Sequence, residues 1–174
     1  VGLGDKIKNV ESSMAALGAN AEDAAMAAAD FTNAFDGIVQ PSEEAMLNLV
    51  AMNKSLGVGT KEASEVAKIF RNLGDMTEDQ AVAQTATVAE MAKLAGVAPQ
   101  KVIADIASSS EEMFKFFGGS TSAMSATAVE AAKLGTSIKE ISAISAQLLD
   151  YDSSINKELE ASAILGTNLN FSQA

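Results

Sequence analysis

The amino-acid sequence predicts an all-α protein, built as an array of helical hairpins. Strand signals are almost absent: no alternating runs of Val, Ile, Thr and Tyr occur, and no Asn-Gly or Asp-Gly turn joins such runs. Apolar residues recur instead at helical intervals, as in Ile138, Ile141, Ile144 and Leu148, which predicts helices with one buried and one wet face. Most glycines fall between these periodic segments, as helix stops do.

Ten helices are expected in chain order. They lie near residues 5–17, 20–36, 42–56, 60–73, 77–95, 99–108, 110–117, 121–134, 137–149 and 153–165. The apolar series Ala63, Val66 and Phe70 supports the fourth of them. Pro41 and Pro99 both lie where a helix begins, a position at which the missing N–H costs nothing.

Four glycines, each 39 residues from the next, give the array its predicted period. They are Gly18, Gly57, Gly96 and Gly135. Three of them directly follow a leucine; each glycine is expected to supply the left-handed residue that ends a helix, while the leucine covers the corner. Repetition of this kind indicates stacked hairpins that bury their apolar stripes against one another. Chance spacing is the alternative, because Leu-Gly endings are common in helical proteins.

The pattern divides the chain into three segments. Residues 1–40 hold less regular N-terminal helices, residues 41–150 hold the hairpin repeats, and residues 151–174 hold a C-terminal helix and the start of a continuing segment. The chain begins at Val1 rather than at a methionine and stops at Ala174 without a helix cap or charged tail. We therefore expect it to be an excerpt or a processed piece of a longer protein.

The composition excludes most familiar enzyme chemistry. The chain has no histidine and no cysteine, which removes disulfides, imidazole and thiolate metal ligands, and Ser-His and Cys-His nucleophilic pairs. It has 12 basic and 23 acidic residues, a formal net charge of -11. Hydrophobic residues make up 48% but aromatic residues only 5%, which predicts a thin core of small side chains. We predict no enzyme, and no catalytic, cofactor-binding or metal site.

Acidic pairs recur along the chain and invite a catalytic or cation-binding interpretation. They are Glu22-Asp23, Glu43-Glu44, Glu78-Asp79 and Glu111-Glu112. Each pair follows a cap-type residue by one or two positions: Asn20, Ser42, Thr77 and Ser110. Negative charge in a first turn offsets the positive end of the helix dipole, so the pairs are predicted to stabilise helix starts.

The run from Asp150 to Asn156 begins like a calcium-binding loop, with oxygen ligands at alternate positions. The rest of the pattern fails, because Ile155 stands where the loop needs glycine and Ala161 where it needs a bidentate glutamate. The sequence therefore predicts a capped linker between two helices here.

Residues 94–104 have the spacing of a DNA-binding helix-turn-helix. DNA recognition needs phosphate contacts from Lys and Arg, yet the second helix offers only Gln100 and Lys101. A hairpin corner is the preferred interpretation, and no specific nucleic-acid binding is expected.

Three phenylalanines, Phe114, Phe116 and Phe117, precede an uncharged run rich in Gly, Ser and Thr. Such a segment can insert into a bilayer surface when it is released, which makes it a candidate interaction or membrane-active segment. The simpler interpretation is a helix end that packs on the core, followed by a hinge loop.

The segment from about Leu56 to Phe171 resembles the tail tape-measure proteins of tailed bacteriophages. Two features carry the resemblance. One is the Ala-rich hairpin with a Leu-Gly corner, as in Ala131–Ile141. The other is the run Leu149–Asn170, which is similar to the family's leucine-aspartate, acidic-helix, leucine-glycine and asparagine-leucine segment.

The resemblance implies a structural protein that sets tail length, templates tail-tube assembly and is released during genome delivery. It implies a place in the virion, in the tail lumen after assembly in the host cytoplasm. The implied partners are tail-tube and baseplate hub proteins and further copies of the chain, with membrane contact only on release. The chain would measure only about 260 Å as one continuous helix. Its glycine stops indicate a folded section of a longer tape measure.

A different class of function stays open beside this one. The chain is alternatively an α-helical adaptor that recognises a partner helix with its Met and Ala faces.

Overall fold

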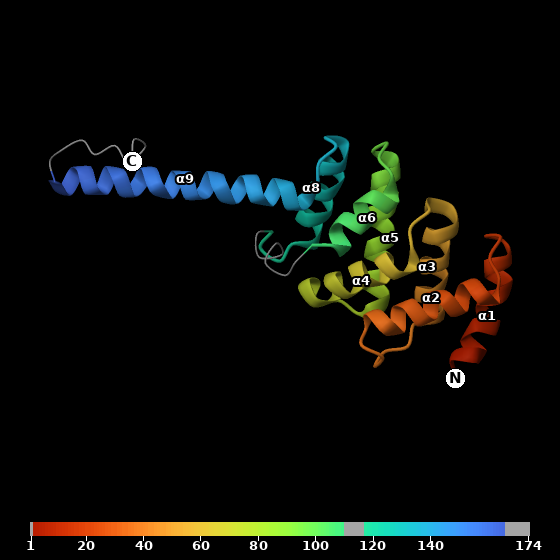
Figure 1. Ribbon diagram of the computed structural model, residues 1–174. Helices are drawn as coiled ribbons and strands as arrows, with labels where there is room; N and C mark the ends of the chain where they lie inside the picture. The colour runs from red at the N-terminus through yellow and green to blue at the C-terminus, as the bar shows by residue number, and fades with distance from the viewer. Residues whose placement is uncertain (1, 110–116, 166–174) are drawn as a thin grey trace. The chain divides into compact units, whose positions relative to one another are not determined.

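A computed structural model describes residues 2–109 and 117–165, and these two ranges contain helices and no strand (Figure 1). The predicted all-α class is confirmed. The helices are α1 (Leu3–Ala15), α2 (Ala21–Ala34), α3 (Glu43–Leu56), α4 (Thr60–Gly74), α5 (Glu78–Leu94), α6 (Pro99–Ala107), α8 (Thr121–Lys133) and α9 (Ile138–Leu165). The helix predicted over residues 110–117 lies outside the described residues except for Phe117, which is in a turn.

The chain forms two compact units, residues 1–138 and residues 139–174. The first unit joins the predicted segment 1–40 to most of the predicted repeat segment 41–150. The second unit begins inside that repeat segment, and its described part is helix α9. Among the described residues, no helix is both long and apolar enough to cross a membrane.

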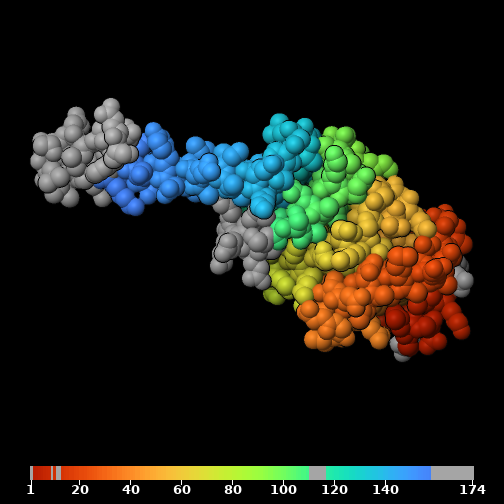
Figure 2. Space-filling model, viewed as in Figure 1, coloured from red at the N-terminus to blue at the C-terminus, as the bar shows by residue number. Residues whose placement is uncertain are grey.

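Unit 1 is built from two layers of helices, because each helix packs on the next but one (Figure 1). In one layer α3 lies between α1 and α5; in the other α4 lies between α2 and α6, and α8 packs on α6. The two layers contact each other most extensively where α4 meets α5. Figure 2 shows the side chains of successive helices in continuous contact along this unit. Stacked hairpins are expected to pack in this way.

The hairpins of this stack are unequal. Helix α4 has 15 residues and the corresponding helix α6 has only 9. Equal spacing of the four glycines is therefore not matched by equal helices. The 39-residue period of the array stays a prediction.

The core is lined mainly by small and flexible side chains. Its largest fully buried members include Phe31, Phe70, Met14, Met46 and Leu49, and many of the others are alanines. Alanines let neighbouring helices approach closely, so that little volume is left for large side chains to fill. The buried hydroxyl groups of Ser64 and Thr85 donate to the carbonyl oxygen four residues earlier in their own helices, at 2.7 and 2.9 Å. The buried Thr60 hydroxyl donates to Asp30 of α2, and the buried Ser142 hydroxyl has no hydrogen-bond partner among the described residues.

Left-handed glycines end four of the described helices. Gly18, Gly57, Gly96 and Gly135 have φ of +69°, +67°, +76° and +73°. At three of these corners the residue after the glycine donates its N–H to the carbonyl oxygen of the residue five positions earlier. The donors are Ala19, Val97 and Thr136, and the N–O distances are 2.9–3.0 Å. This bond satisfies a carbonyl group that the end of the helix leaves without a partner.

The leucines directly before the glycines were predicted to cover the corners, and for Leu134 the prediction is wrong, because its side chain is 78% exposed. Leu17 and Leu56 are partly buried and pack against the core. At the fourth corner, where Ala95 precedes the glycine, Leu94 is 88% exposed. The chain turns back toward the helix only after the left-handed residue, so the residue that follows the glycine is the one that points inward. Val58 accordingly is fully buried and Ala19 nearly so.

The two helices predicted over residues 137–149 and 153–165 are one continuous helix, the 28-residue α9 (Figure 1). The linker predicted at Asp150–Asn156 is therefore wrong. Neither glycine nor proline occurs between residues 138 and 165. Asp, Ser and Asn cost a helix only up to about 0.7 kcal/mol each relative to alanine, which is too little to end it. The Asn156 amide instead donates to Asp152 one turn earlier, at 3.4 Å.

The acidic residues at the described helix starts bind backbone and neighbouring side chains. Asp23 accepts the backbone N–H of Asn20 at 3.0 Å and pairs with Lys54 of α3 at 2.9 Å. Further along, Asp79 accepts the Ser42 hydroxyl and Glu78 pairs with Arg71. These contacts agree with the predicted role in stabilising helix starts, whereas the pair Glu111-Glu112 lies outside the described residues.

Replacing Gly57 by alanine should lower the free energy of unfolding by about 1–2 kcal/mol, because a left-handed backbone is that costly for a residue with a Cβ. No atom lies within 4 Å of the added Cβ, so the cost comes from the backbone alone. Gly57→Asn should cost less, since asparagine tolerates this conformation. Gly4→Ala, in helix α1 with ordinary φ and open space, is the control and should stabilise the protein. Urea unfolding measures all three; a Gly57→Ala variant as stable as the parent contradicts the corner assignment.

Asp23 should make part of the stability depend on pH. Its hydrogen bonds with Lys54 and with the Asn20 backbone hold the pKa of Asp23 below the ordinary 3.8. A carboxyl whose pKa is lowered by folding stabilises the protein above its unfolded pKa, and this contribution is lost as the pH falls through the folded value. The melting temperature of Asp23→Asn should therefore fall less than that of the parent below pH 3.8. Glu22→Gln removes a neighbouring charge as a control; identical acid profiles for the parent and Asp23→Asn would refute the coupling.

Candidate functional site

The described residues offer two surfaces that could bind a partner, one in each unit. They contain no group of three or more acidic residues placed to hold a metal ion. Their buried Ser and Thr hydroxyls mostly serve the helix backbone. The candidate sites are therefore the exposed apolar surfaces of this part of the chain.

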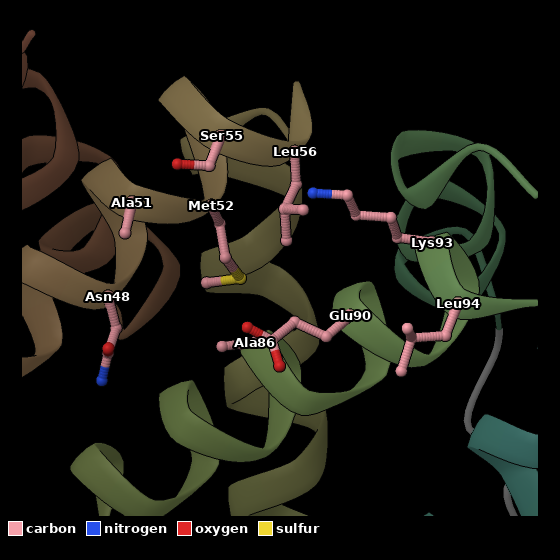
Figure 3. Close-up of a pocket in the computed structure, with 9 residues that line it drawn as sticks. All are labelled: Asn48, Ala51, Met52, Ser55, Leu56, Ala86, Glu90, Lys93 and Leu94. Carbon is pink, nitrogen blue, oxygen red and sulfur yellow. The ribbon is translucent and has the colours of Figure 1, made fainter. Parts of the chain in front are cut away.

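The first surface is a groove of about 360 Å³ between α3 and α5, in one layer of unit 1 (Figure 3). Its lining residues come from the middle and the C-terminal half of each helix. They are Asn48, Ala51, Met52, Ser55, Leu56, Ala86, Glu90, Lys93 and Leu94. The groove exists because α3 and α5 lie side by side as next-but-one neighbours in the stack.

The groove has an apolar floor and a polar rim. Met52 is almost fully buried and forms the floor, and the small side chains of Ala51 and Ala86 leave space above it. Glu90 and Lys93 stand on α5, and Figure 3 shows the Lys93 side chain reaching across toward α3. A surface with small residues at its centre and one charge of each sign at its edge suits the apolar face of a helix.

The second surface is an apolar stripe along α9. Ile141, Ile144, Leu148, Tyr151 and Ile155 follow one another at intervals of three, four, three and four residues. We call these five residues the α9 seam. Four of them are well exposed: Ile144 by 57%, Leu148 by 63%, Tyr151 by 68% and Ile155 by 38%.

The α9 seam corrects one expectation drawn from the spacing of apolar residues. The series from Ile138 to Leu148 was predicted to be a buried stripe. Ile138, the last residue of unit 1, is fully buried, but Ile144 and Leu148 are more than half exposed. Helical spacing shows which residues share a face, and it does not show whether another element of the same chain covers that face.

The residues singled out in the sequence do not form one site. Gly18, Gly57, Gly96 and Gly135 lie at four separate corners of the fold. Of the three phenylalanines, Phe117 is partly buried and packs against the core, while Phe114 and Phe116 lie outside the described residues.

The segment with helix-turn-helix spacing forms the corner between α5 and α6. Leu94 is exposed there, and Lys101 is exposed on α6. Asp105, also on α6, accepts the backbone N–H of Ile138 at 2.8 Å, so it ties α6 to the start of the last helix. One lysine on this helix offers little to a phosphate backbone.

The groove could not be found from the sequence, because its two walls lie about 40 residues apart and face each other only in the stack. Its weak signal is the alanine on each helix, Ala51 and Ala86, where a larger residue would fill the space.

Comparison of the chain with known protein families, with characterised proteins and with solved structures found no match.

Proposed function

We propose that the chain is a folded helical section of a tail tape-measure protein, located in the lumen of a phage tail. The observation that supports this proposal is the stack of hairpins itself. The corner at Gly135 and the start of α9 occupy the residues that carry the resemblance, Ala131–Ile141. A protein whose role is geometric needs such a stack and needs no catalytic residue, cofactor or metal.

The proposed mechanism is assembly around a scaffold. Tail-tube and baseplate hub proteins would contact the exposed faces of the stack, and copies of the chain would associate with one another. The net charge of -11 would repel the phosphate backbone of DNA, so the chain would not retain the genome that must pass through the lumen. The segment around Phe114, Phe116 and Phe117 would meet a membrane only after release.

The test is location in a virion. A tag on the longer protein that contains this chain should co-purify with intact particles and should leave them when DNA ejection is triggered. Quantitative mass spectrometry of particles before and after ejection measures both steps. A major tail-tube subunit, which should stay in the particle, is the control. Absence of the chain from purified virions, or its retention after ejection, contradicts the proposal.

The second candidate function is an adaptor that binds a partner helix, and the groove between α3 and α5 favours it. Its apolar floor and its unlike charges, Glu90 and Lys93, match a helix with an apolar face flanked by both signs of charge. This function does not require a virion.

An amphipathic helical peptide with leucines three and four residues apart should bind this groove. We expect the methyl resonance of Met52 to shift in NMR spectra as the peptide is added, because Met52 forms the floor. Leu94→Asp should abolish the shift by placing a charge on the apolar wall. Leu134→Asp, at another corner and similarly exposed, is the matched control and should bind like the parent. Equal binding by both variants would place the peptide elsewhere.

A further inference from the structure

We propose that helix α9 binds the α9 of a second copy of this chain, side by side and antiparallel, through the α9 seam. This inference names a partner for the self-association proposed above, but it rests on the geometry of α9 alone. A failed virion test would leave it standing.

The spacing of the seam indicates what kind of partner it fits. Intervals of three and four residues average 3.5, the repeat at which one helix inserts its side chains into the holes of another. A flat apolar face would suit many partners, but this repeat suits a second helix with the same repeat. The α9 helix of another copy meets that requirement.

The residues beside the seam permit a copy to approach. Ser145, Gln147 and Ser154 flank it and carry no charge, whereas Glu140 and Asp152 are its two charged flanking residues. Two copies can therefore close on each other with little like-charge repulsion at the flanks. The short side chains of Ser145 and Ser154 also leave room for the two helices to approach closely.

The distribution of charge along α9 favours an antiparallel pair. Residues 138–149 carry one lysine and one glutamate, Lys139 and Glu140, whereas residues 150–165 carry one lysine and four acids. A parallel pair would place the two acidic halves side by side. An antiparallel pair places each acidic half beside the nearly neutral half of the other copy, and it also aligns opposite ends of the helix dipoles.

One antiparallel register pairs the four exposed residues of the seam with one another. When Leu148 lies level with Tyr151 of the other copy, Ile144 lies level with Ile155. The four exposed seam residues then form four apolar layers related by a twofold axis, as an isologous interface requires. Ile144 of one copy and Ile144 of the other would lie about 16 Å apart along the axis.

The expected dimer is weak. The seam from Ile141 to Ile155 is about 21 Å long, or two heptads, and stable coiled coils generally need three or more. We therefore expect a dissociation constant in the micromolar range or weaker.

Analytical ultracentrifugation of the full chain tests the proposal. The weight-average mass should rise with concentration from 17.9 kDa toward twice that value and no further. Leu148→Asp should keep the chain monomeric at every concentration. Leu149→Asp is a closely matched control, because Leu149 is the next residue and is also 63% exposed but lies off the seam. It should dimerise like the parent. Far-UV circular dichroism should show the same helix content in both variants.

Disulfide trapping tests the direction. The parent has no cysteine, so chains with Ile144→Cys and chains with Ile155→Cys can be mixed and oxidised cleanly. Mixed 144–155 disulfides should predominate. Disulfides between like chains would overturn the antiparallel arrangement.

Three results of the mass measurement overturn the proposal outright. A parent that stays monomeric shows that the seam binds no second copy, whether it is open or covered by its own chain. Growth beyond a dimer shows a different assembly. Equal loss of association in Leu148→Asp and Leu149→Asp shows that the seam is not the interface.

Discussion

The fold depends on the close approach of helices whose buried faces are largely alanine. A single hairpin of this kind buries little area, because an alanine side chain removes few atoms from water. Each helix therefore needs a partner in its own layer as well as one across it. Next-but-one packing supplies both: α4 contacts α2 and α6 within its layer and α5 in the other. Two stacked layers therefore allow an alanine-rich chain to form a core without large aromatic side chains.

The helix-ending glycines could be predicted from the local sequence, whereas side-chain contacts that depend on the whole stack could not. A glycine after an amphipathic segment needs a positive φ wherever it ends a helix, so Gly57 and Gly135 could be placed at corners without tertiary information. The neighbouring leucines could not be placed. Whether Leu134 is buried depends on which helix lies beyond its corner, and no pattern within one hairpin contains that information.

The error over α9 has a related cause. Asp and Ser are common at helix caps, so the run at Asp150–Asn156 suggested a boundary. Four of the described helices end at a glycine with left-handed backbone, and α4 ends at Asp75 in the same conformation, with φ of +50°. No glycine lies within α9. Residues with weak helix propensity are common at helix boundaries, but inside a helix each costs too little free energy to end it. The candidate groove, whose walls are joined only by the stack, gave no comparable local signal.

The two exposed apolar surfaces have different physical origins. The groove is a by-product of packing: α3 and α5 must lie side by side, and the alanines that bring helices close also leave a hollow above Met52. The α9 seam follows from no such requirement. Ile144, Leu148 and Tyr151 are exposed, and none of them belongs to the core of unit 1. Apolar side chains kept in strict register at a surface are explained most simply by a partner with the same register.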